Sequence, residues 1–81
     1  MNHLEEARES TKKVKEVIDN KEVAAVSFKI SSSMLHGNFD RARDQAISLC
    51  KVAGVNTFPF AISKDYEDEK VIDEFLNELG R

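Results

Sequence analysis

The sequence has no long apolar segment and only one cysteine, and each absence excludes a class of protein. No apolar run approaches the roughly 20 residues of a membrane-spanning helix, so we expect no transmembrane segment. Cys50 stands alone and can form no internal disulfide. The N-terminus carries acids early, unlike a secretory signal. Together these features favour a cytoplasmic protein.

Metal ligands and nucleotide-binding motifs are also scarce. His3, His36 and Cys50 are too few and too scattered for a zinc site. The chain has neither a G-x-x-x-x-G-K-[ST] loop nor a glycine-rich dinucleotide fingerprint, since Gly37 has no glycine near it. We therefore expect no metal and no cofactor.

The remaining composition is that of one soluble domain. The chain has 81 residues, of which 41% are hydrophobic and 33% charged. A domain this small buries only about 60–65% of its chain surface and is marginally stable alone. With no disulfide or zinc to staple it, self-association is the simplest way to complete its core, so we expect a homo-oligomer.

Charge is unevenly distributed. Residues 1–22 carry a net charge of −1, residues 23–62 of +2 and residues 63–81 of −4. An acidic chain lacks the basic surface that duplex nucleic acid requires, so we expect no such partner. The mildly basic centre still allows a small anion to bind there.

The pattern of apolar residues predicts a small α/β fold of order αβαβα. Leu4, Ala7, Thr11, Val14 and Ile18 form a helical stripe, and Val71, Ile72, Phe75, Leu76 and Leu79 form another. Alternating apolar residues predict two short strands, which the helices cover and homo-oligomerisation completes. The expected elements are a helix over 2–19, a strand over 23–30, a loop over 31–38, a helix over 39–53, a strand over 55–62 and a helix over 65–79.

Details of the second strand follow from its residues. Phe58, Phe60 and Ile62 are expected on one apolar face, with Thr57 and Ala61 on the other. Pro59 has no N–H to donate to the hydrogen bonds between strands, which predicts an edge position in the sheet or a bulge.

Candidate chemistry is concentrated in the loop that leads into the middle helix. The first N–H groups of a helix lack backbone partners and carry partial positive charge, so a polar loop entering a helix favours anions. Arginines in the first turns can hold a phosphate through paired N–H groups. Tyr66 adds an exposed ring for base stacking. The predicted ligand-binding residues are Ser31, Ser32, Ser33, His36, Asn38, Arg41, Arg43 and Tyr66.

Three alternatives remain open. The serines are also common turn formers, and the two arginines could pair with Asp40 and Asp44 in an ordinary solvent loop. A protein–protein regulator would instead use the acidic C-terminal helix or the N-terminal helix. A small hydrolase would need Ser33 and His36 as a pair, but no acid is placed to orient the imidazole.

In size, acidity, single-domain layout and polar strand-to-helix loop, the chain resembles the small phage-encoded sponge proteins that sequester cyclic nucleotide signals of bacterial immunity. This resemblance rests on those features alone. It implies a symmetric assembly in the cytoplasm of a bacterial host, two anion pockets serving one symmetric ligand, and binding without hydrolysis. The sequence therefore predicts a non-enzymatic protein that sequesters a small phosphate-bearing ligand, most plausibly a nucleotide.

Overall fold

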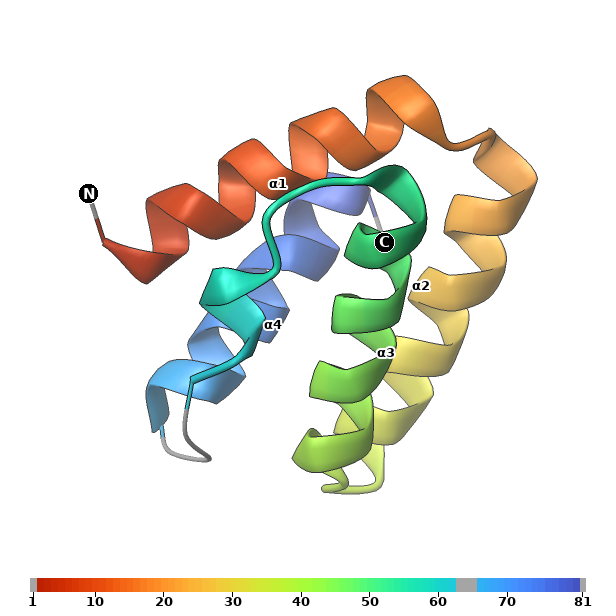
Figure 1. Ribbon diagram of the computed structural model, residues 1–81. Helices are drawn as coiled ribbons and strands as arrows, with labels where there is room; N and C mark the ends of the chain where they lie inside the picture. The colour runs from red at the N-terminus through yellow and green to blue at the C-terminus, as the bar shows by residue number, and fades with distance from the viewer. Residues whose placement is uncertain (1, 63–65, 81) are drawn as a thin grey trace.

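The fold is built from four α-helices and one short 3₁₀-helix (Figure 1). The computed structural model describes residues 2–62 and 66–80, and within these ranges it contains no β-strand. The elements are α1 (His3–Val17), α2 (Asn20–Leu35), α3 (Phe39–Ala53), the 3₁₀-helix η1 (Phe58–Phe60) and α4 (Tyr66–Leu79).

The predicted α/β class is therefore wrong, and the first predicted strand is part of α2. Val23 and Ile30 are buried while Phe28 is exposed, so the seemingly alternating residues do not share a face. Burial instead follows a helical spacing from Val23 through Ile30 to Ser33. The predicted loop is also mostly helical, because α2 continues to Leu35 and only residues 36–38 form the turn.

Two local features explain why this segment is a helix. The side chain of Asp19 caps α2 by accepting a hydrogen bond from the Glu22 N–H at 3.0 Å, so the segment has a well-formed helix start. No glycine or proline interrupts the chain from Asn20 to Leu35. Short apolar runs fit strand and helix patterns alike, and here the cap and the absence of breakers favour the helix.

The second predicted strand is also wrong. Its centre forms η1, in which Pro59 occupies the first turn, where its missing N–H costs nothing. Phe60 is buried at 1% exposure and Phe58 is 54% exposed, so the two rings do not line one face. The ring of Phe60 packs edge-on against Phe75 with their centroids 4.8 Å apart, which joins this segment to α4.

The three remaining predictions of helices are confirmed. α1 buries Ala7, Thr11 and Val14, and α3 has its predicted bounds. Gly54 follows α3 with a φ of 71°, the left-handed conformation that glycine adopts readily. The stripe of α4 is buried as the spacing predicts, at Val71, Ile72, Phe75, Leu76 and Leu79.

The helices pack as two neighbouring pairs around one core. α2 and α3 form an antiparallel hairpin, and α1 packs along α4 (Figure 1). Arg8 of α1 forms an ion pair with Glu74 of α4, and Lys15 donates to the Glu78 carbonyl at 3.2 Å. In the described ranges, every helix is too short or too polar to cross a bilayer.

Candidate functional site

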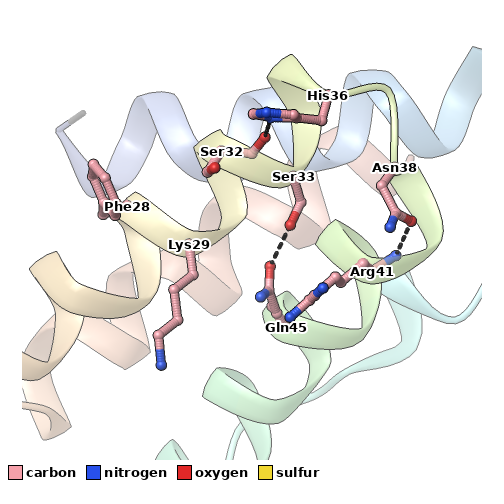
Figure 2. Close-up of a pocket in the computed structure, with 8 residues that line it drawn as sticks. All are labelled: Phe28, Lys29, Ser32, Ser33, His36, Asn38, Arg41 and Gln45. Atoms are coloured by element: carbon pink, nitrogen blue, oxygen red, sulfur yellow. Dashed lines mark hydrogen bonds between the residues drawn. The ribbon is translucent and has the colours of Figure 1, made fainter.

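A groove of about 530 Å³ lies between α2 and α3, near the turn that joins them (Figure 2). This volume is within the range of small-molecule pockets. We call it the α2/α3 groove. Its lining residues are Phe28, Lys29, Ser32, Ser33, His36, Asn38, Arg41 and Gln45.

The end of the groove is fixed by a tightly hydrogen-bonded turn. The N–H groups of His36, Gly37 and Asn38 donate to three carbonyls at the end of α2, at 2.9 to 3.2 Å. These bonds satisfy carbonyls at the end of α2 that would otherwise lack partners. The Asn38 side chain accepts from the Arg41 N–H at 3.2 Å and caps α3.

Hydroxyl and amide groups form the floor between the helices. Ser33 is 9% exposed and its Oγ donates to Oε1 of Gln45 at 3.1 Å, which links α2 to α3 (Figure 2). Because the carbonyl of this amide faces Ser33, the Gln45 NH₂ group is left to donate elsewhere. Ser32 lies one residue earlier on α2 and is half-buried.

The His36 ring is held at the mouth of the groove by its own helix. Its Nδ1 lies 2.8 Å from the Ser32 carbonyl oxygen. A carbonyl only accepts, so Nδ1 carries the hydrogen in this contact. Nε2 is then an acceptor in the neutral ring and a donor in the imidazolium. Only the protonated ring can donate to an anion through Nε2.

Positive charge in the groove comes from Lys29 and Arg41. Aspartate and glutamate are absent from its described lining. Neither the Lys29 ammonium nor the Arg41 guanidinium has a hydrogen-bond or ion-pair partner among residues 2–62 and 66–80. In Figure 2 the Arg41 side chain extends along the space between the two helices. Two such cations in a concave site without acids favour an anionic ligand.

An exposed aromatic ring forms one wall. Phe28 is 76% exposed and stands on α2 beside Lys29 (Figure 2). A ring this open can stack on a flat aromatic ligand next to Lys29.

Three of the predicted site residues are not placed in this groove. Ser31 lines a separate cavity of about 460 Å³ with residues that include Leu79. Arg43 points to the other side of α3, where it lies 3.7 Å from Asp40, 4.0 Å from Asp44 and 3.8 Å from Asp68. Tyr66 begins α4, but its side chain lies outside the described part of the chain.

The groove thus brings together Ser32, Ser33, His36, Asn38 and Arg41. Ser32 and Ser33 stand on α2 instead of the predicted loop, whereas His36 and Asn38 lie in the turn and Arg41 on the predicted helix. Sequence reasoning missed Phe28, Lys29 and Gln45. Helical spacing could have found them. Phe28 and Ser32 on α2 and His36 just after it recur at intervals of four, and Gln45 lies one turn after Arg41 on α3.

Cys50 is a buried thiol of the core. It is 0% exposed, and burial raises its pKa from 9.0 to about 12. It therefore stays protonated near neutral pH and is a poor nucleophile. The described residues contain no cluster of three or more side chains suited to a metal ion.

Comparison with known proteins gives no relative for this chain. Neither the protein-family models, nor the curated proteins, nor the solved structures include a match. The function is therefore argued from the groove itself.

Proposed function

We propose that the α2/α3 groove binds a small phosphate-bearing ligand of the nucleotide class and holds it without chemical change. On this view the protein sequesters its ligand, acting as a homo-oligomer in the cytoplasm. The observation that carries the proposal is that Lys29 and Arg41 line the same groove and that no described residue neutralises either of them. The described lining of the groove also contains no acid.

Phosphate is the anion that this set of donors fits best. The Arg41 guanidinium offers parallel N–H donors, which match two phosphate oxygens, and Lys29 supplies a second positive charge. Ser32 and the Gln45 amide add neutral donors on the floor between them. A phosphate group presents several oxygens in different directions and can use all of these groups together.

The nucleotide class follows from the position of Phe28. Its open ring stands beside Lys29 in the lining of the groove, so a base could stack there while the phosphate meets Lys29 and Arg41. Stacking of this kind contributes roughly 1–3 kcal/mol per base. Inorganic phosphate alone would leave the ring unused and should bind more weakly.

The arrangement of polar groups supports binding without catalysis. Ser33 donates to Gln45, and the His36 Nδ1 is directed to the Ser32 carbonyl, so each side chain of the proposed Ser33–His36 pair is engaged elsewhere. A nucleophile needs a neighbouring base to activate it. The most reactive residue type, the Cys50 thiol, is buried away from the groove.

The alternative of a regulator working through acidic α4 has less support. Glu74 is paired with Arg8 and its side chain is only 19% exposed, while Glu78 lies 3.8 Å from the same guanidinium. Part of the acidic surface therefore serves to hold α1 against α4. In the α2/α3 groove, in contrast, Lys29 and Arg41 have no described partner.

Isothermal titration calorimetry with mono-, di- and cyclic dinucleotides tests the proposal, with inorganic phosphate as the comparison. We expect at least one nucleotide to bind and to bind more tightly than phosphate. Absence of heat with every nucleotide at about 100 μM protein would contradict a nucleotide-binding function.

A further inference from the structure

We propose that the α2/α3 groove selects oxyanions that carry no hydrogen on oxygen. Among phosphate-bearing ligands, a phosphodiester then fits over the whole working pH range, whereas a phosphate monoester fits only when it is fully ionised. This inference rests on the proposed function and deepens it, because it names the form of phosphate that the groove takes. It is carried by two hydrogen bonds within the protein that engage the amide oxygens of the groove and leave the amide nitrogens as donors.

The Gln45 amide is fixed so that it offers a donor. Its Oε1 accepts from the Ser33 Oγ at 3.1 Å, across the space between α2 and α3 (Figure 2). Since the oxygen and nitrogen of an amide point in different directions, the NH₂ group is not turned toward Ser33 and keeps its two N–H donors. This NH₂ group has no partner among residues 2–62 and 66–80. Ser33 is therefore a positioning residue, because it determines which end of the Gln45 amide a ligand meets.

The Asn38 amide, just before α3, is held in the same sense. Its Oδ1 accepts from the Arg41 backbone N–H at 3.2 Å as the cap of the helix, which leaves its NH₂ group to donate (Figure 2). The hydrogen bonds of Asn38 and Gln45 are independent of each other, one with a backbone group and one with a side chain. Both amides of the described lining thus have their oxygens engaged by the protein.

The other polar side chains of the groove also favour donors over acceptors. Lys29 and Arg41 only donate, and the described lining has no carboxylate that could accept. The Ser32 hydroxyl can donate or accept, and the His36 Nε2 accepts only while the ring is neutral. A P–OH hydrogen therefore meets few acceptors in this groove, whereas a bare phosphate oxygen meets several donors.

Two ligands of equal charge separate this hydrogen-bond matching from simple attraction between charges. A phosphate monoester has a second pKa of roughly 6, so at about pH 5 it is a monoanion with one P–OH group. The methyl ester of the same nucleotide is a phosphodiester, which is also a monoanion but has no P–OH group. Their difference in affinity at about pH 5 therefore reports the P–OH hydrogen and not the net charge.

Calorimetry at about pH 5 with uridine and guanosine 5′-monophosphates and with their methyl esters tests the inference. We expect each diester to bind about 3- to 10-fold more tightly than its monoester, the effect of one mismatched hydrogen bond. At about pH 8 the preference should shrink or reverse, because the monoester has lost that hydrogen and gained charge. Equal affinities at about pH 5, or tighter binding of the monoester there, would overturn the inference while leaving nucleotide binding intact. Absence of binding by all four ligands would instead contradict the proposed function.

Variants of Ser33 test whether the fixed amide is the cause. Ser33→Ala removes the hydroxyl that holds the Gln45 amide, so the amide can rotate and accept from P–OH. The preference for the diester at low pH should then decrease, and Ser33→Thr, which keeps a hydroxyl, should retain it. A merely structural role of Ser33 would weaken both ligands alike and leave their ratio unchanged. An unchanged ratio in Ser33→Ala would therefore contradict its role as a positioning residue.

Asn38→Asp gives a second test, which remains available if Ser33→Ala folds poorly. Aspartate keeps the cap on α3 but replaces the NH₂ donor with an acceptor. Because both ligands are monoanions at low pH, the added charge weakens both, and the ratio of their affinities should fall. Asn77→Asp, the same change on the exposed surface of α4, should leave the ratio unaltered. The preference should also persist in His36→Ala, and its loss there would assign the selectivity to the imidazole instead of the amides.

Discussion

The Arg43 guanidinium lies 3.8 Å from the carboxylate of Asp68, which is only 3% exposed, and so connects α3 to the first turns of α4. The same side chain donates to the Ile62 carbonyl at 3.2 Å, just before the segment that leads to α4. Arg43 therefore has a structural role. Arg41, two residues earlier, points into the α2/α3 groove and has no such partner among the described residues.

Arg43→Met should destabilise the fold. It removes the guanidinium beside a buried carboxylate, and breaking such a pair costs roughly 2–4 kcal/mol when one partner is partly exposed. Urea unfolding followed by circular dichroism measures the change in the free energy of unfolding. Arg41→Met is the matched control and should change that free energy by less than about 0.5 kcal/mol. Equal stabilities of the two variants would contradict the different roles assigned to the two arginines.

Lys29→Ala and Arg41→Ala should weaken nucleotide binding without unfolding the protein. A hydrogen bond to a charged group contributes roughly 1.5–3 kcal/mol, so each change should reduce affinity about 10- to 100-fold. Calorimetry gives the affinities. Lys13→Ala, an equal change of charge on the exposed surface of α1, should have little effect. If all three variants bind alike, the cations of the groove do not hold the ligand.

Cys50 should resist alkylation in the native state. Burial raises its pKa to about 12, so at pH 8 the thiol is protonated as well as inaccessible. Its reaction with iodoacetamide should begin only as urea unfolds the chain, and mass spectrometry follows the modified fraction. Rapid alkylation of folded protein would contradict the position of this side chain in the core.

The sequence predicts an element correctly where its end signals and the spacing of its apolar residues indicate the same bounds. For α3, Asn38, the buried stripe and Gly54 all indicate the same bounds, and the structure has them. The prediction failed where the apolar residues of one segment fit both the two-residue repeat of a strand and the repeat of a helix. Val26, Phe28 and Ile30 alternate in a strand-like pattern, but burial follows the helical spacing of Val23 and Ile30.

The site was predicted only in part, because the sequence again fits more than one local structure. Three consecutive serines indicate a loop, since serine competes for backbone hydrogen bonds and favours turns. In the structure they belong to α2, which turns Ser31 away from the groove and brings Phe28 and Lys29 into it. Arg41 and Arg43 point to different sides because residues two apart on a helix do not share a face, but the partner of Arg43, Asp68, lies on α4 and is distant in sequence. Sequence spacing on α3 alone could not show that contact.

An NMR titration of isotope-labelled protein with the best-binding nucleotide tests the central claim most directly. If the α2/α3 groove binds the ligand, the largest shifts of backbone amides will cluster at Phe28, Lys29, Ser32, Arg41 and Gln45, and the side-chain amide of Gln45 will shift with them. Shifts confined to α4, or spectra that stay unchanged at about 1 mM nucleotide, would show that this groove is not the binding site.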